Sequence, residues 1–389
     1  MTPTEEFDAA LLPEERAFLE RVKEFGETVV APQAKEWEYA RRPPIDILRR
    51  ACREGFAGVE LPKESGGLGL RFSAKARMAE ELSKHDLAFT FALIQHHNAL
   101  VRIAESAQAE DARKLVARML TGDAIGCTAM SEPDAGSDFS ALATVARKVD
   151  GGWRLDGEKG WITNAAIADV FLTYAQTELG SGSKGIACFI VTSDAPGFER
   201  QPAYEMHGAH AAGVGGYAMK DCFVRDAMLL YPPGAGFKSA MQGVNRARIH
   251  VTAMNAGILE SALTTALHYG EQRKAFGKPL LDFQGLAWSL ADVATHLAAM
   301  RLLAYRGAHL IDQGHDAVEA AAIAKKFGND YTLKGVAACM QAMGANGLRA
   351  DYPLARHLTA AKLLAYTDGT VEMMNERIVH LLRKRAGTK

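Results

Sequence analysis

The sequence lacks the features that mark several common classes of protein. Its cysteines have no paired spacing, so we expect buried, free thiols in a reducing compartment rather than a disulfide framework or a zinc site. They are Cys52, Cys127, Cys188, Cys222 and Cys339. No run of 18 apolar residues occurs, which argues against a membrane-spanning helix. The first residues, MTPTEEFDAALLPEE, are acidic and have no apolar core. They do not look like a signal peptide, so we expect a cytoplasmic protein.

An excess of charge of one sign is also missing. The 45 lysines and arginines are balanced by 46 aspartates and glutamates, giving a net charge of -1. A nucleic-acid or anionic-membrane partner would need a basic face, and the sequence predicts neither partner. There is no Walker P-loop, and no GxGxxG follows a strand, which argues against a Rossmann dinucleotide site. The HHN run at 96–98 lacks metal-ligand spacing, so we expect a helix cap or a hydrogen-bonded pair there and no metal site.

What the sequence has is three stretches of different texture, and 389 residues are enough for two or three domains. Residues 1–122 carry apolar side chains at helical spacing, which predicts an N-terminal helical domain. Residues 123–232 predict a middle domain of short antiparallel strands. Residues 233–389 return to helical texture and predict a four-helix bundle, with a seam of apolar residues from Leu286 to Met300. The fold class is therefore α+β.

Several segments of the middle domain have the composition of strands. These are residues 169–177, 184–193 and 217–225. Trp153 and Leu155 alternate with polar residues and are followed by Asp156-Gly157, a dipeptide that predicts a hairpin turn. The Gly- and His-rich run at 206–216 is expected to be a flexible surface loop.

Two loops of this domain could hold a flat polar ligand. The first, TAMSEPDAGSD at 128–138, combines small residues, hydroxyls and tight turns, which lets backbone N–H groups approach a ligand closely. The second, KGWITN at 159–164, sets an aromatic residue between a glycine and a hydroxyl. Taken alone, the first could be a plain turn and the tryptophan could belong to the core.

Together with three later motifs, these loops strongly resemble the FAD-dependent acyl-CoA dehydrogenase family. The later motifs are QRKAFGKPLLDFQ (272–284), QAMGANGLRADYPLARH (341–357) and AYTDGTVEMMNER (365–377). All five lie in the family's order and at its spacing, over essentially the whole chain. The resemblance implies removal of a proton from Cα and a hydride from Cβ of an acyl-CoA thioester, with FAD bound between the β-domain and the bundle. It also implies a homotetramer and an electron-transfer flavoprotein as electron acceptor.

The resemblance assigns FAD contacts in the chain itself and to the FAD of a neighbouring subunit. The first group is Thr128, Met130, Ser131, Ser137, Trp161, Ile162, Thr163, Thr370 and Glu372. The second group, on the pyrophosphate and adenosine side, is Arg273, Phe276, Gln284, Gln341, Gly344 and Ala345. Contacts to substrate and CoA are assigned to Ser137, Asn245, Arg248 and Gly369. A guanidinium suits a diphosphate because it donates a fork of charge-assisted hydrogen bonds.

The catalytic base departs from the family pattern. The family usually carries glutamate before Gly-Thr in the last motif, and Asp368 stands there in this chain. The alternative base position is occupied by Ala247, which cannot take a proton. Asp368 is therefore predicted to be the base, although it could instead cap the following helix. Its side chain is shorter by one methylene, roughly 1.3–1.5 Å, which favours a branched or cyclic acyl group held closer to the carboxylate.

Other chemistries of the same superfamily remain open at this point. Nitroalkane oxidases use aspartate as base but pair it with arginine seven residues later, where this chain has Asn375. A desulfinase-like activity would keep the FAD site without the usual glutamate. The loop at 206–216 lacks the arginine that the family often has there. A non-catalytic protein that binds FAD or acyl-CoA is the remaining alternative.

Overall fold

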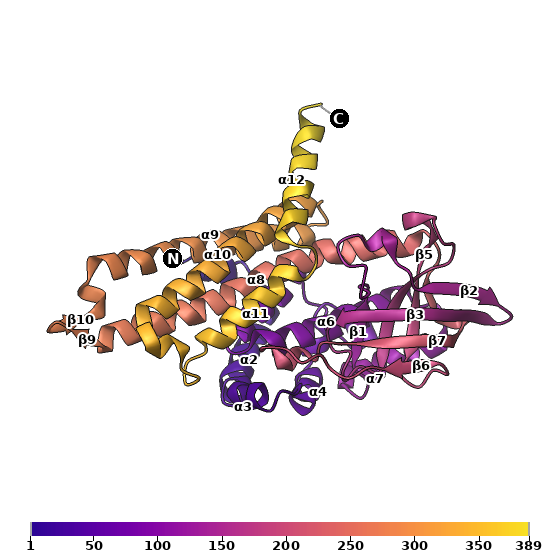
Figure 1. Ribbon diagram of the computed structural model, residues 1–389, viewed down its shortest axis with the longest axis horizontal. Coiled ribbons are helices and arrows are strands. Elements are labelled where there is room, and N and C mark those ends of the chain that lie inside the picture. The colour runs from indigo at the N-terminus through magenta and orange to yellow at the C-terminus, as the bar shows by residue number, and fades with distance from the viewer. Residues whose placement is uncertain (1, 388–389) are drawn as a thin grey trace.

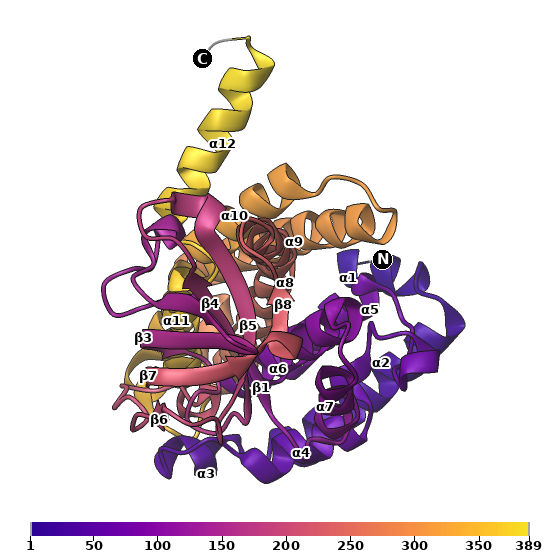
Figure 2. The same ribbon diagram turned by 90° about the vertical axis from the view of Figure 1, so that its right-hand side faces the viewer.

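The computed structural model describes residues 2–387 and has three parts in chain order (Figure 1). The sheet lies at one end of the elongated molecule, long helices run away from it, and the N-terminal helices cover one side (Figures 1 and 2). The predicted fold class, with a helical, a β and a second helical part, is confirmed. The boundaries expected near residues 122 and 232 fall between the last helix of the first part and the first strand, and between the last strand and the next helix.

The first part is a set of helices around a buried central helix. Its members are α1 (Pro3–Ala9), α2 (Pro13–Phe25), α3 (Ala34–Tyr39), α4 (Ile45–Arg53), α5 (Phe72–Ser83), α6 (Leu87–Ser106) and α7 (Glu110–Thr121). Helix α6 begins where the Asp86 carboxylate accepts a hydrogen bond from the Phe89 N–H at 2.8 Å, as an N-cap should. Apolar residues on nearly every face bury α6 between the other helices and the sheet.

The middle part is one eight-stranded sheet in the order β6-β7-β3-β2-β4-β5-β8, with β1 paired to β4. The strands are β1 (Gly126–Ala129), β2 (Val145–Val149), β3 (Gly152–Ile162), β4 (Val170–Gln176), β5 (Ile186–Thr192), β6 (Phe198–Arg200), β7 (Gly215–Arg225) and β8 (Leu229–Tyr231). All three predicted strand segments are present as β4, β5 and β7. Pairing is antiparallel except between β4 and β1 and between β4 and β2, which are parallel.

The predicted hairpin turn at Asp156-Gly157 is wrong. These residues lie inside β3, where the register with β7 shifts after Leu155. A Cβ at Gly157 would meet the Thr144 side chain at 2.6 Å, so glycine is required there by close packing of the neighbouring segment. The turn between β2 and β3 uses the other Asp-Gly dipeptide, Asp150-Gly151, with Gly151 in the left-handed region at φ 73°.

The loop at 206–216 is not a flexible surface segment. Ala209, Ala211 and Ala212 are buried in the N-terminal core. The Glu38 carboxylate accepts hydrogen bonds from the backbone N–H groups of Ala209 and His210. Small side chains let this loop pack closely against α3 and α6, which explains its alanine and glycine content.

The last part is built from long helices. They are α8 (Ala235–Gln272), α9 (Gln284–Asp312), α10 (Val318–Met343), α11 (Leu354–Tyr366) and α12 (Val371–Arg385), with a short β9 (Lys274–Ala275) and β10 (Lys278–Pro279) hairpin after α8. The predicted seam is buried in α9 from Leu290 to Met300. All five cysteines are buried and unpaired, as expected. No helix within residues 2–387 is long and apolar enough to cross a membrane.

Candidate functional site

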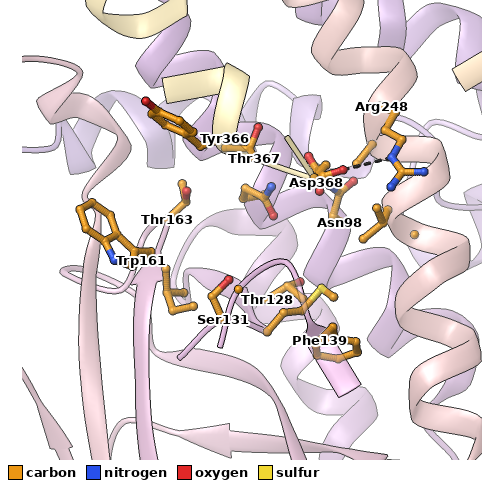
Figure 3. Close-up of a pocket in the computed structure, with 18 of the residues that line it drawn as sticks. Asn98, Thr128, Ser131, Phe139, Trp161, Thr163, Arg248, Tyr366, Thr367 and Asp368 are labelled. Atoms are coloured by element: carbon orange, nitrogen blue, oxygen red, sulfur yellow. Dashed lines mark hydrogen bonds between the residues drawn. The ribbon is translucent and has the colours of Figure 1, made fainter. Parts of the chain in front are cut away.

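A cavity of about 1120 Å³ lies where the sheet, α6, α8 and the turn between α11 and α12 meet. Figure 3 shows Trp161 and Thr163 at one side of it, Asp368 and Arg248 at the other, and Thr128 and Ser131 below. The cavity brings together most of the residues assigned to one subunit's FAD and to the substrate. Those that line it are Thr128, Met130, Ser131, Ser137, Trp161, Ile162, Thr163, Arg248, Asp368, Gly369 and Thr370.

A buried ion pair joins the two loops that form the sheet side of the cavity. Lys159 at the start of the second motif contacts Glu132 of the first motif at 2.8 Å, and its ammonium also donates to the Met130 carbonyl. Glu132 further accepts hydrogen bonds from the backbone N–H groups of Ala143 and Thr144. Burial alone would raise the pKa of Glu132, but Lys159 and these donors hold it below its usual value. The two loops are therefore fixed relative to each other.

The sheet side of the cavity has the properties that a flavin ring would need. The Thr128 hydroxyl is buried there and has no hydrogen-bond partner, so a polar group of a ligand can satisfy it. Trp161 is 63% exposed, with a left-handed φ of 60°, and its ring packs edge-on against Tyr204. An indole held in this way offers an apolar face to a planar ligand. The residues present therefore fit FAD.

The Asp368 carboxylate faces the cavity from the turn before α12. Its backbone is held by Arg248, whose Nε donates to the Asp368 carbonyl at 3.1 Å (Figure 3). Its Oδ2 atom is buried and has no hydrogen-bond partner. The alternative role as a helix cap is wrong, because the Thr370 hydroxyl accepts the hydrogen bond from the Met373 N–H and is the N-cap of α12.

Burial and nearby cations act on this carboxylate in opposite directions. Burial raises the pKa of Asp368, although the charges of Lys325, Arg248 and Arg102 oppose the rise. Lys325 on α10 is itself buried, which lowers its pKa to about 8 despite the attraction of Asp368. Its ammonium donates a hydrogen bond to the Leu364 carbonyl at 3.2 Å, near the end of α11. A carboxylate in such a place can act as a stronger base than one in water.

Asn245, the remaining residue assigned to substrate binding, contacts Arg248. Its side-chain oxygen accepts a hydrogen bond from Arg248 Nη1 at 2.9 Å, on the same helix. Asn245 therefore orients the guanidinium that holds the Asp368 backbone. Burial lowers the pKa of Arg248 to about 10, so it stays charged at neutral pH.

The other assigned FAD residues do not line this cavity. Glu372 lies just beyond the turn, in the first turn of α12. Arg273 and Phe276 lie at the far end of α8, at the β9–β10 hairpin, away from the sheet (Figure 1). Gln284 begins α9, and Gln341, Gly344 and Ala345 lie at the end of α10. These positions do not line the chain's own cavity.

Three family models match consecutive parts of the chain. They describe the N-terminal, middle and C-terminal domains of acyl-CoA dehydrogenases and match residues 12–123, 127–222 and 234–382. An acyl-CoA dehydrogenase of Bacillus subtilis is 32% identical over 90% of this chain and 93% of its own length. The chain belongs to the acyl-CoA dehydrogenase family. As a member it is an FAD-dependent enzyme that acts on acyl-CoA thioesters.

Further relatives agree with this assignment over nearly the full length of the enzyme. Human mitochondrial short-chain specific acyl-CoA dehydrogenase is 32% identical over 97% of this chain and 92% of its own. The structure of butyryl-CoA dehydrogenase from Megasphaera elsdenii matches with a TM-score of 0.92 and 30% identity, covering 96% of this chain and 98% of that one. A glutaryl-CoA dehydrogenase from Mycobacterium smegmatis in complex with FADH2 matches with a TM-score of 0.91 and 26% identity, over 98% of both chains.

Several residues of the site in this acyl-CoA dehydrogenase were missed by sequence reasoning. His96 and His97 lie inside α6 and are hydrogen-bonded to the Met119 and Ala57 carbonyls, so they form neither a helix cap nor a pair. Asn98 next to them lines the cavity (Figure 3). Arg102, one turn further along α6, also lines it. Lys325 lies in an alanine-rich stretch of α10. The signal that could have found them is a polar residue recurring on one face of an otherwise apolar helix.

Proposed function

We propose that Asp368 is the base that removes the α-proton of a short acyl-CoA in this dehydrogenase. The observation that carries the proposal is the buried, unpartnered Asp368 Oδ2 atom in the cavity. A polar atom in this situation is costly unless a ligand or a proton satisfies it. The names of relatives that are short-chain specific support a small acyl group.

The other residues of the chain act by holding this base and the thioester. Arg248 fixes the turn that carries Asp368. The dry surroundings make the Asp368 carboxylate a stronger base. The α-proton of a thioester is a weak acid, so a donor must stabilise the negative charge that develops on the carbonyl oxygen. We assign this role to the Asp368 backbone N–H. Bound FAD supplies the acceptor for the hydride that leaves Cβ.

The setting of the enzyme follows from its relatives. A close structural match is the electron-transferring flavoprotein system of Acidaminococcus fermentans, with a TM-score of 0.92 and 32% identity. We therefore assign an electron-transfer flavoprotein as acceptor. A homotetramer, in which Arg273, Phe276 and the end of α10 complete a neighbour's FAD site, is supported by the distance of these residues from the chain's own cavity. A cytoplasmic location stays a prediction.

An anaerobic bleaching experiment tests the proposal. The FAD-loaded enzyme is mixed with straight, branched and cyclic acyl-CoAs, and the loss of flavin absorbance is followed. Wild type should bleach with at least one thioester, and Asp368→Asn should lose at least about a thousandfold in rate because it has no base. Asp46→Asn, an exposed aspartate on α4, is the control and should behave as wild type.

The outcomes separate the alternatives. Bleaching that survives in Asp368→Asn would show that another group takes the proton. If no thioester bleaches a flavin that stays bound, the chain is a non-catalytic binding protein. A preference for branched or cyclic acyl groups would support the expectation drawn from the short aspartate side chain.

A further inference from the structure

The wall of the cavity beside Asp368 is polar, although an unsubstituted acyl chain has no polar atoms. One face of α6 carries Gln95, Asn98, Arg102 and Glu105, at steps of three, four and three residues, and all four line the cavity. The charge of Arg102 acts on the Asp368 carboxylate, which places this face of α6 near the base, and Asn98 lines the same cavity (Figure 3). A substrate whose Cα meets the Asp368 carboxylate would therefore meet this face with its next carbons.

A second layer of charged residues supports this wall. The Asn98 side-chain oxygen accepts a hydrogen bond from the Lys75 ammonium at 2.9 Å. Lys75 also pairs with Glu60 at 2.9 Å, and Arg246 from α8 contacts the other oxygen of Glu60. Because its oxygen is occupied, Asn98 has its amide N–H2 donors left for a ligand.

Arg102 is the basic residue on this face of α6. Its guanidinium donates to the Tyr174 hydroxyl at 2.6 Å and to the Ser239 carbonyl at 3.3 Å, both neutral groups. It forms no ion pair with a carboxylate in the part of the chain that the structure describes. A Cβ at Gly243 of α8 would lie 1.4 Å from its Nη2 atom, so any side chain there would force the guanidinium to move from its present position.

The charges along the wall favour an anion. The side chains that line the whole cavity include six cations and five carboxylates, which leaves one positive charge in excess. The cations are Lys75, Arg102, Arg246, Arg248, Lys362 and Arg377, and the carboxylates are Glu60, Glu105, Glu132, Asp138 and Asp368. An apolar chain placed here would remove water from these groups without replacing their hydrogen bonds, and this loss would offset the gain from burying its methylenes. A carboxylate would instead receive charge-assisted hydrogen bonds.

We propose that this dehydrogenase acts on acyl-CoA thioesters whose acyl group ends in a carboxylate, with Arg102 and Asn98 as the residues that bind it. The inference rests on the proposed function, because it takes Asp368 as the point where Cα is held. It makes Arg102 a specificity residue rather than a residue of the reacting centre.

The test compares matched thioesters that differ only by the terminal carboxylate. Rates are measured for succinyl-, glutaryl- and adipyl-CoA against butyryl-, pentanoyl- and hexanoyl-CoA with wild-type holoenzyme. At least one carboxylated member should exceed its partner in kcat/KM by about 10- to 100-fold, the effect expected of one charge-assisted hydrogen bond. Equal or better use of all three unsubstituted members would overturn the inference and leave the proposed function intact.

Two variants locate the effect. Arg102→Met should lower kcat/KM for the preferred carboxylated substrate about 10- to 100-fold more than for its unsubstituted partner, chiefly through KM. Losing the charge that acts on Asp368 affects both substrates alike, so the ratio of the two kcat/KM values is the readout. Arg102→Lys keeps the charge and should retain part of the preference. Arg118→Met, on the exposed face of α7, is the control. If Arg102→Met lowers kcat/KM equally for both substrates while FAD content and melting temperature stay normal, the specificity role is wrong. If no thioester bleaches the flavin at all, the proposed function fails instead.

Discussion

At the scale of single residues, the backbone of Asp368 explains how a short side chain reaches the cavity. Its φ is 52°, in the left-handed region that aspartate tolerates better than most residues, and Gly369 after it has a φ of 95°. Two such residues in a row turn the chain sharply between α11 and α12, and Arg248 fixes the carbonyl in the turn. The carboxylate is thereby positioned by the backbone rather than by side-chain length alone.

This geometry predicts the effect of lengthening the base. Asp368→Glu adds one methylene, so its carboxylate would no longer match a substrate fitted to aspartate. We expect a loss of about tenfold or more in kcat/KM for the best wild-type substrate and a shift of preference toward straight-chain thioesters. Steady-state assays on the same acyl-CoA panel measure both effects. An unchanged preference would show that reach does not set the choice of substrate.

The buried cation near the base predicts a pH effect. Lys325 favours the ionised form of Asp368, so removing its charge in Lys325→Met should raise the pKa of Asp368 further. Activity requires the ionised carboxylate, and the acid limb of kcat/KM should therefore move to higher pH. Lys326→Met is the matched control, since Lys326 is half-buried on the same helix and pairs with Asp330. A lower rate with an unchanged pH profile would show that Lys325 contributes to packing and does not control the protonation of Asp368.

At the scale of elements, the two motif loops of the middle domain work as one unit because of the Glu132–Lys159 pair. Breaking a buried ion pair from one side costs about 3–5 kcal/mol, because the other charge is left without compensation. Lys159→Met should therefore lower the melting temperature and loosen FAD, because the loop with Thr128 and Ser131 loses its anchor. Flavin release in a thermal ramp measures both. Lys148→Met, which removes an exposed pair with Asp226, should have little effect.

Sequence reasoning succeeded where the signal is local or repeated. The α9 seam is long and periodic, the strands β4, β5 and β7 contain many β-branched and aromatic residues, and the motif loops carry their own turn residues. It failed at Asp156-Gly157, because an Asp-Gly dipeptide marks a turn unless a neighbouring segment needs its glycine for close approach. Asn98, Arg102 and Lys325 were missed because their roles arise from contacts between helices distant in the sequence. Polar residues recurring on one face of a helix mark that face, but they do not indicate which other elements will meet it around a shared cavity.

At the scale of the whole molecule, the chain leaves surfaces that suit other copies of itself. Helix α12 projects from the body in both views (Figures 1 and 2), and Val379 and Leu382 are exposed on it. Phe276 at the β9–β10 hairpin is 95% exposed. Exposed apolar residues on separate projections are typical of an interface whose partner is absent.

An assembly experiment follows. Val379→Asp with Leu382→Asp should reduce the oligomer observed by light scattering, because two carboxylates would be buried at a contact between subunits. His380→Asp, which adds the same charge at a polar position of α12, is the control. Smaller particles should also retain less FAD if neighbouring subunits complete its site. A full-size oligomer in the double variant would place the contact elsewhere.

Buried histidines predict how stability depends on pH. Burial lowers the pKa of His96 to about 4 and that of His357 to about 3. The unfolded chain binds these protons near pH 6.5 and the folded chain does not, so stability should fall as the pH drops from 6.5 toward 4. Each such histidine adds about 1.4 kcal/mol per pH unit to the slope. Urea denaturation across this range should show a shallower slope for His357→Gln, and the exposed His315→Gln should match wild type.

The close packing of Arg102 against Gly243 has a consequence for the sequences of homologous dehydrogenases. Any side chain at position 243 would force the Arg102 guanidinium out of the position that points it into the cavity, because a Cβ there would lie 1.4 Å from Nη2. These two letters, far apart in the sequence, should therefore change together among homologues. Arg102 together with Gly243 would then mark, from the sequence alone, dehydrogenases whose acyl-CoA substrate ends in a carboxylate.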